Sequence, residues 1–132
     1  MYGEKIKKNF VNPKNAGRPR GANASAKLTT ENGDIIKIFF KVNEYEVVED
    51  AKFKAFGGPV TIAALNVVCE MVLDKTLEEC LKIMDYDILN ELEKVPEKNI
   101  SDVSNAKNVV KMAIENYQLK KEKELKKLNK IQ

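Results

Sequence analysis

Residues able to do chemistry are few in this sequence of 132 residues, which contains two cysteines and no histidine. The lack of histidine excludes histidine-based triads, histidine general bases and histidine metal ligands. Cys69 and Cys80 lie inside apolar helical patterns, which predicts buried free thiols rather than reactive nucleophiles or a disulfide. Because no nucleophile is accompanied by an activating base, we expect the chain not to be an enzyme.

A second set of candidates carries oxygen: Asn32, Asp34, and the adjacent Ser101 and Asp102. Together these side chains would form an all-oxygen cluster of the kind that binds Mg²⁺ or Ca²⁺ weakly. The simpler interpretation makes Asp34 a turn residue and Ser101-Asp102 a helix start, where a capping hydroxyl and a carboxylate are favourable. Asp34 and Asp102 are the candidate metal ligands. Because two carboxylates are a small ligand set, we favour the structural interpretation over the metal site.

The turn at Gly57-Gly58 joins a strand-like run to an apolar helix within AFGGPVTIAALNVV, residues 55–68. This layout often presents a reactive side chain at the turn. Gly58 is best placed to carry one and has none, so the glycine pair either serves a tight turn or marks a site that has lost its ligand.

The pattern from residue 26 to residue 56 predicts three antiparallel strands in a meander. Asn32-Gly33 separates two runs rich in β-branched residues, and this dipeptide favours a hairpin because both residues tolerate a positive φ. A second turn at Asn43-Glu44 leads to a run in which Ala51, Phe53 and Ala55 alternate with lysines. One face of the sheet is therefore expected to pack on helices and the other to face water.

The other segments predict helices around this sheet. Pro59 suits the first turn of a helix because its missing N–H needs no partner there, Thr76 with Glu79 fits a capping box, and Ser101 can cap the last helix. Helices are expected at 4–10, 59–73, 76–83, 85–93 and 101–117, with an irregular crossing loop at 12–21 and a charged helical extension at 118–132. We therefore predict one domain over 1–132, of class α+β, with a three-stranded antiparallel sheet and helices packed on one face.

Charge and composition exclude some classes of partner. The segment 116–132 holds six lysines and two glutamates, a local charge of +4, whereas the whole chain has a formal charge of +3. The rest is close to neutral, which gives little support to nucleic-acid binding. The N-terminus lacks the apolar region of a secretory signal, and no segment approaches the roughly 20 apolar residues of a membrane span. We expect a cytoplasmic protein with neither nucleic acid nor membrane as a partner.

The order of these elements resembles the U-type iron-sulfur cluster scaffold family, the group of IscU and the NifU N-terminal domain. The resemblance covers about residues 2–121. It is carried by NPKNAG near the start, NGD after the first strand, KVNEYEVVEDAKFKAFG through the next two strands, LDKTLEEC between helices and NVVKMAIENYQLKK near the end.

The resemblance implies a site at which three cysteines, an aspartate and often a histidine hold a [2Fe-2S] cluster or zinc, since thiolates suit such centres. At the matching positions this chain has Asn32, Gly58 and the pair Ser101-Asp102, and of the family's ligands only the aspartate, Asp34, is present. We therefore expect no cofactor on the isolated chain and interpret the five positions as a degenerate cluster site.

Two functions are compatible with this pattern. In the first, the chain is a non-catalytic, scaffold-like adaptor that keeps the family's docking surface for a cysteine desulfurase or another sulfur-transfer partner. In the second, it is an iron or zinc carrier or scaffold that uses Asp34 and Asp102 with ligands supplied by a partner. The sequence does not define the oligomeric state.

Overall fold

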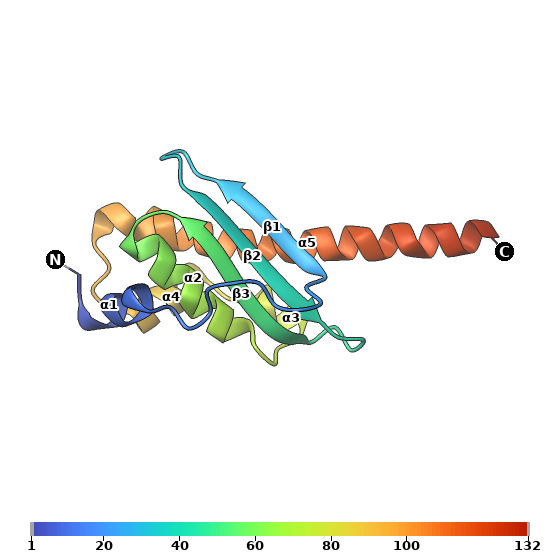
Figure 1. Ribbon diagram of the computed structural model, residues 1–132, viewed down its shortest axis with the longest axis horizontal. Helices are drawn as coiled ribbons and strands as arrows, with labels where there is room; N and C mark the ends of the chain where they lie inside the picture. Colours follow the sequence, from blue (N-terminus) through green and yellow to red (C-terminus); the bar gives the residue numbers. More distant parts are fainter. Residues whose placement is uncertain (1, 132) are drawn as a thin grey trace.

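A computed structural model describes residues 2–131 of the chain, and for residue 131 the backbone alone. It confirms the α+β class and the three-stranded antiparallel sheet (Figure 1). The elements in chain order are α1 (Glu4–Val11), β1 (Ala24–Thr29), β2 (Ile35–Val42), β3 (Val48–Phe56), α2 (Pro59–Val72), α3 (Leu77–Cys80), α4 (Asp85–Leu92), the 3₁₀ helix η1 (Glu97–Asn99) and α5 (Ile100–Ile131).

The sheet is a meander in the order β1-β2-β3. The predicted hairpin at Asn32-Gly33 joins β1 to β2, but only Gly33 has a positive φ, at 85°. The N–H of Gly33 donates to the carbonyl of Thr30 at 3.0 Å, and the N–H of Thr30 donates to the carbonyl of Asp34 at 2.9 Å. The connection is therefore a longer turn that ends on a left-handed glycine, not the two-residue turn that the dipeptide favours.

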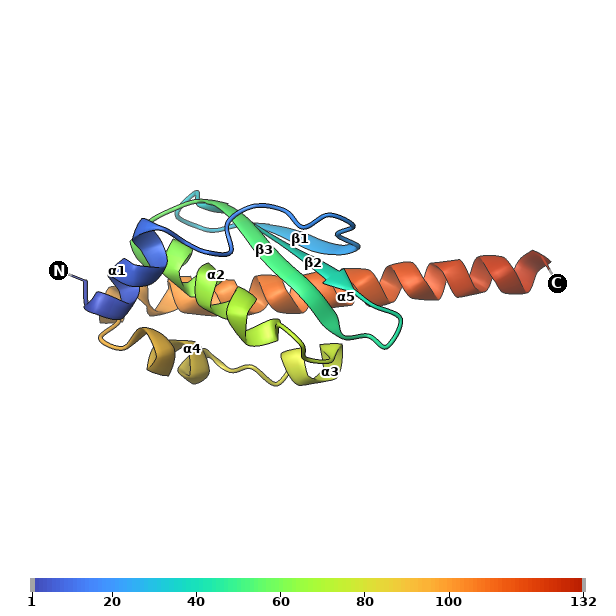
Figure 2. The same ribbon diagram turned by 60° about the horizontal axis from the view of Figure 1, so that its bottom comes forward.

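One face of the sheet packs on the helices, as predicted. Ile36, Ile38 and Phe40 of β2 are fully buried, and Phe53 of β3 is 2% exposed. The helices α2 and α5 lie against this face, with α3 and α4 beyond them (Figure 2). Alternation along each strand directs the intervening side chains to the opposite face.

Two of the three polar residues of α2, Thr61 and Asn66, are buried, whereas Glu70 is exposed. Asn66 is 3% exposed because α1 and the crossing loop cover it. Its side-chain amide donates to Asn9 Oδ1 at 2.8 Å, and its Oδ1 accepts from the backbone N–H of Asn15 at 2.9 Å. The loop also pairs with β3 through an isolated parallel bridge between Ala16 and Phe53. These contacts fix the N-terminal segment to the body.

Two short helices connect α2 to α5. The capping box of Thr76 and Glu79 is confirmed, with hydrogen bonds in both directions at 2.9 and 3.1 Å, but α3 ends at Cys80 and not at Ile83 as expected. The helix α4 begins after Met84, whose N–H donates to Asp87 Oδ2 at 2.8 Å.

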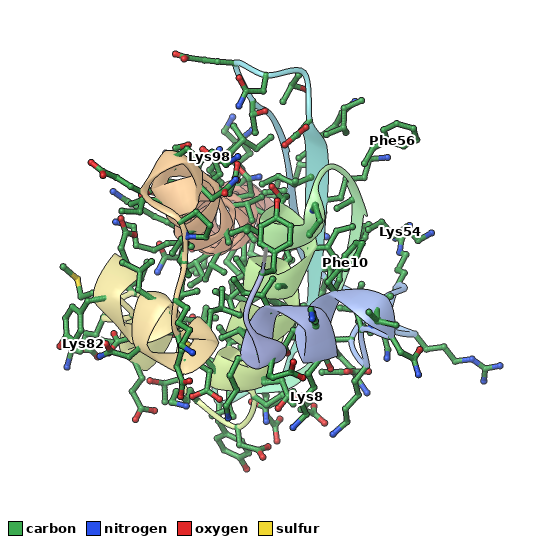
Figure 3. The ribbon with its side chains drawn as sticks, turned by 90° about the vertical axis from the view of Figure 1, so that its left-hand side faces the viewer. Lys8, Phe10, Lys54, Phe56, Lys82 and Lys98 are labelled. Carbon is green, nitrogen blue, oxygen red and sulfur yellow. The ribbon has the colours of Figure 1, made fainter. Side chains whose placement is uncertain are left out.

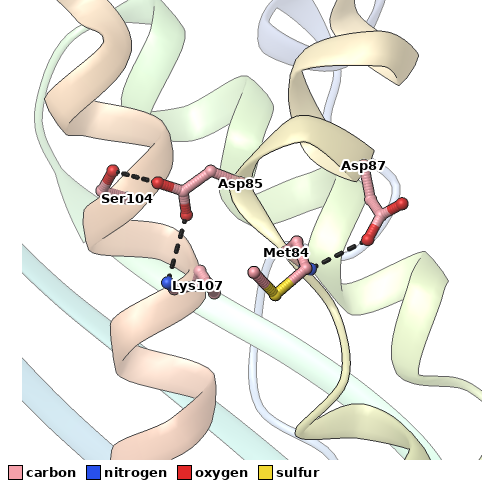
Figure 4. A network of polar contacts seen from close by, with 5 residues as sticks. All are labelled: Met84, Asp85, Asp87, Ser104 and Lys107. Carbon is pink, nitrogen blue, oxygen red and sulfur yellow. Dashed lines mark hydrogen bonds and ion pairs between the residues drawn. The ribbon is translucent and has the colours of Figure 1, made fainter.

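Asp85 holds α4 on α5. Its carboxylate accepts from the hydroxyl of Ser104 and lies 3.4 Å from the Lys107 ammonium (Figure 4). These interactions fix the distance between the outer helix layer and the long helix that crosses beneath the sheet.

The helix α5 begins at Ile100, directly after η1, so Ser101 lies inside it and is not its N-cap. Its buried side includes Val103, Ala106 and Val110. Beyond Tyr117 the helix projects from the body (Figure 1), and its side chains from 118 to 130 are exposed. Within the part of the chain that the structure describes, no helix is both long and apolar enough to cross a membrane.

Candidate functional site

The five positions singled out in the sequence lie at the ends of elements that meet on one side of the molecule. Asn32 and Asp34 belong to the β1-β2 turn, Gly58 precedes α2, and Ser101 and Asp102 lie in the first turn of α5. This end lies opposite the projecting C-terminal helix, and α1 lies there too (Figures 1 and 2). The sheet and the two long helices thus gather the positions without any sequence proximity between them.

Asp34 faces the turn between β3 and α2. The hydroxyl of Thr61 donates to its Oδ2 at 3.5 Å, and Thr61 itself is 2% exposed. A Cβ placed on Gly57 would lie 3.2 Å from both Asp34 Oδ2 and the Thr61 methyl. A side chain at position 57 would be crowded by the carboxylate of Asp34 and by Thr61, which explains the glycine there. For Gly57, this supports the interpretation that the residue serves the turn.

Gly58 has the opposite environment. Its backbone is extended, with φ −79° and ψ 177°, and a Cβ placed there would meet nothing within 4 Å. Neither conformation nor space requires glycine at this position. The turn therefore presents an open point at the N-terminus of α2 from which a side chain of any residue type would project.

A polar cavity of about 400 Å³ separates the hairpin from α5. It is lined by Thr30, Glu31, Asn32, Ser101 and Asn105. The structure thus brings together Asn32 and Ser101, two of the predicted positions, in surroundings of amide and hydroxyl groups with one carboxylate. Such a lining supplies hydrogen bonds and weak, hard oxygen donors and no soft ligand.

Asp102 does not line this cavity. Its Oδ2 accepts from the side-chain amide of Asn99 at 2.9 Å, so the carboxylate fixes the junction between η1 and α5. Asp34 and Asp102 therefore have separate hydrogen-bond partners. Among residues 2–131 no three histidine, cysteine, aspartate or glutamate side chains are grouped closely enough to hold a metal ion.

Three residues of this region were missed in the sequence, namely Glu31, Thr61 and Asn105. Asn105 lies four residues after Ser101, and this helical spacing was a usable signal because such pairs share one face. Thr61 had no comparable signal, since its contact with Asp34 depends on how α2 leaves the sheet.

The two cysteines are buried free thiols, as predicted, and lie outside this region. Cys69 is fully buried in α2, and desolvation raises the pKa of its thiol despite the opposing effect of Lys52. Burial likewise raises the pKa of Cys80 to about 11. Because the thiolate is the nucleophile and metal ligand, neither residue is activated near neutral pH.

The fold and the candidate site together define a class of protein. Its members have an antiparallel meander with helices on one face, and a candidate ligand site where the β1-β2 turn, the β3-α2 turn and the start of α5 converge. The NifU-like N terminal domain family model matches residues 1–124. The chain therefore belongs to the NifU-like N-terminal domain family, whose relatives function in iron-sulfur cluster assembly.

The sequences of two named relatives support this family assignment. The chain is 34% identical to the iron-sulfur cluster assembly scaffold protein IscU of Escherichia coli strain K12 over 125 residues, covering 92% of this chain and 97% of that protein. It is 36% identical over 118 residues to the nitrogen fixation protein NifU of Azotobacter chroococcum mcd 1. That match covers 88% of this chain and 38% of NifU. The chain thus spans the length of IscU but well under half of NifU.

Solved structures show the same fold. A putative iron-sulfur cluster assembly scaffold protein for the SUF system from Fervidobacterium islandicum AW-1 superposes with a TM-score of 0.73 at 19% identity, over 86% of this chain and 96% of that one. The N-terminal part of a NifU-like protein from Brucella abortus gives 0.70 at 17% identity, over 89% and 94% of the two chains.

Proposed function

We propose that this chain is a non-catalytic adaptor of iron-sulfur cluster assembly, which docks on a cysteine desulfurase or related sulfur-transfer partner without holding a thiolate-ligated cluster itself. The observation that carries the proposal is Gly58. It occupies the exposed turn where the family resemblance places a cysteine, and its surroundings leave room for a side chain that the chain lacks.

The donor set does not fit a [2Fe-2S] cluster. Around the turn the chain offers the carboxylate of Asp34, and around the cavity it offers the amide of Asn32 and the hydroxyl of Ser101. Iron-sulfur clusters require soft thiolates, and both thiols of the chain are buried elsewhere. What this end retains is its shape, formed by α1, the hairpin, the β3-α2 turn and the start of α5.

The alternative is a carrier of iron or zinc that uses Asp34 and Asp102 with ligands from a partner. It is less favoured because Asp34 interacts with Thr61 whereas Asp102 interacts with Asn99. A carrier would have to break the Asn99 contact and bring in at least two outside ligands. Such a site would form only in the complex.

Reconstitution tests the absence of a cluster. Anaerobic incubation with iron, sulfide and a desulfurase should give no cluster absorbance on the native chain. The triple variant Asn32→Cys, Gly58→Cys, Asp102→Cys is the matched positive control, because Asn32 is exposed and Gly58 has space for the new side chain. A stoichiometric [2Fe-2S] spectrum on the native chain would contradict the proposal.

Docking is tested with a purified cysteine desulfurase from the source organism. Ile6 of α1 is fully buried, so deleting the helix would expose the core, whereas Lys5 and Lys8 are exposed and can be reversed in charge. We expect the native chain to bind and Lys5→Glu/Lys8→Glu to weaken binding. The variant Lys126→Glu/Lys127→Glu on the extension is the control. No binding by the native chain, or equal loss in both variants, would exclude docking through this end.

Metal titration separates the two candidates. A carrier should gain thermal stability from micromolar Fe²⁺ or Zn²⁺ by mass action, and Asp34→Ala should abolish the gain. The adaptor proposal expects the same melting temperature with and without metal in both chains. A rise that depends on Asp34 would favour the carrier.

A further inference from the structure

A largely apolar cavity lies among the helices, between α2, α5 and the connection from α3 to α4. Its volume is about 300 Å³. Val68 of α2, Cys80 of α3 and Val110 of α5 form its inner wall, and each is at most 3% exposed. Leu81 and Met84 of the connection, which runs beneath α2 and α5 in Figure 2, are 44% and 50% exposed. The cavity is therefore closed by the core on one side and open to solvent on the other.

The inner wall of the cavity suits hydrocarbon better than water. Val68 and Val110 offer methyl groups, and the Cys80 thiol donates to the carbonyl of Val72 at 3.8 Å. Burial raises the pKa of Cys80 to about 11, so this thiol is neutral near neutral pH. A water molecule held in a cavity needs about two to four polar partners, and such a wall supplies few. An apolar group is therefore favoured over water in this space.

Two lysines give one side of the cavity a positive charge. Lys107 and Lys111 both line it, and because they lie four residues apart on α5 they share one face of that helix. Within the part of the chain that the structure describes, no carboxylate lines the cavity. Lys107 pairs with Asp85 at 3.4 Å, whereas the contact of Lys111 with Glu115 is 3.9 Å long and exposed. An exposed pair of that kind contributes little, so the Lys111 ammonium is available to an anion.

The open side of the cavity is lined by side chains that can adapt to a ligand. Figure 4 shows the Met84 side chain extending from just before α4 toward Lys107 on α5. Methionine is unbranched and flexible, and it is common at binding surfaces that accommodate apolar groups. Leu81 and Met84 both expose apolar surface at this opening. A ligand with an apolar chain would therefore remove surface of both residues from water.

We propose that this cavity binds a medium-chain fatty acid, with the alkyl chain against Val68, Cys80 and Val110 and the carboxylate at the Lys111 ammonium. Small-molecule sites have volumes of roughly 300–1,000 Å³, so this cavity is at the lower end and suits a chain such as that of octanoate. A nucleotide or a sugar phosphate would satisfy the lysines, but its other polar groups would meet the apolar wall without hydrogen-bond partners. A fatty acid matches both the wall and the charge.

The cavity is separate from the candidate docking end and from the outer surface of the sheet. Figure 3 shows Lys82, which belongs to the connection bordering the cavity, on the opposite side of the molecule from Phe56 at the end of β3. Within residues 2–131, the lining shares no residue with the polar cavity between the hairpin and α5. Fatty-acid binding therefore does not rest on the adaptor function.

The experiment is isothermal titration calorimetry of the full chain with sodium octanoate, well below the concentration at which it forms micelles. Burial of the alkyl chain predicts an affinity about fourfold lower for each methylene removed, so hexanoate should bind about fifteenfold more weakly. Lys111→Gln should weaken octanoate binding about threefold and leave octanol binding unchanged, since octanol has no carboxylate. Lys120→Gln on the extension removes the same charge outside the cavity and should leave both affinities unchanged.

Methyl NMR spectra and a cavity-filling variant locate the ligand. Octanoate should shift the methyl signals of Val68, Met84 and Val110 and leave that of Leu128 on the extension in place. Val110→Phe places a ring in the cavity and should abolish binding while the chain still melts cooperatively. Absence of binding, an affinity independent of chain length, or full binding by folded Val110→Phe would overturn the proposal. If that variant does not fold, the methyl signals decide, and shifts confined to other parts of the chain would overturn it.

Discussion

Replacing Asn66 by alanine tests how the N-terminal segment is held at the candidate docking end. The substitution leaves the N–H of Asn15, a residue 6% exposed, without its acceptor. An unsatisfied buried donor costs about 1–3 kcal/mol. Asn9 also loses its donor, but it is partly exposed and can bond to water, so this loss adds about 0.5–1 kcal/mol. We expect the free energy of unfolding to fall by about 1.5–4 kcal/mol.

Thermal unfolding followed by circular dichroism measures this change. For a domain of this size each kcal/mol corresponds to about 3–5 °C, so the melting temperature should fall by roughly 10 °C. Hydrogen exchange adds a local test, because the amides of α1 should exchange faster than those of β2. Asn108→Ala is the matched control, since Asn108 is exposed on α5 and alanine favours a helix.

A change within about 0.5 kcal/mol of the native chain would refute this reasoning, because substitutions away from buried networks give values of that size. It would mean that water or a shifted loop replaces Asn66 as the partner of Asn15. Faster exchange in β2 as well as α1 would show global rather than local loosening.

Three further outcomes are expected. Gly57→Ala should destabilise the fold by about 1–3 kcal/mol in denaturant unfolding, because its Cβ crowds Asp34 and Thr61, whereas Gly58→Ala should be nearly neutral; equal costs would contradict the assignment of close approach to Gly57 alone. Burial raises the pKa of Cys80 to about 11, so the stability from its neutral thiol should be present below about pH 8.5 and fall as the pH rises toward 11; a Cys80→Ala variant with the same alkaline profile would refute this. Deleting residues 118–132 should change the melting temperature by only a few degrees, since the side chains from 118 to 130 are exposed, and a loss of cooperative melting would show that the extension belongs to the core.

Much of the fold could be predicted from the sequence, because the local signals agreed with the arrangement of the elements in the folded chain. Asn32-Gly33 placed the first hairpin, Pro59 placed the start of α2, and Thr76 with Glu79 fixed the start of α3. Each of these depends on the conformational preferences or hydrogen bonds of a few neighbouring residues. The ends of elements were less certain, as with Ser101, because η1 leads directly into α5 and no side chain is needed to cap it.

Contacts between residues that are far apart in the chain could not be predicted from a single sequence. The burial of Asn66 depends on α1 and the crossing loop, whose residues Asn9 and Asn15 precede it by 57 and 51 residues. A row of three exposed lysines on the outward face of the sheet could not be predicted for a related reason. The composition indicates a nearly neutral body, whereas the sheet register places Lys27, Lys37 and Lys54 side by side.

The contacts of Asn15 with Asn66 have a consequence for the order in which the chain is made. Residues 4–16 leave the ribosome before their partners in β3 and α2, which are synthesised about 40–50 residues later. At roughly 5–20 residues per second, the N-terminal segment waits several seconds before it can dock. The helix α2 in turn packs on α5, which is synthesised later still. Nascent chains should therefore expose α1 to other proteins until α2 has been synthesised, and the candidate docking end should form only after α5 has been made.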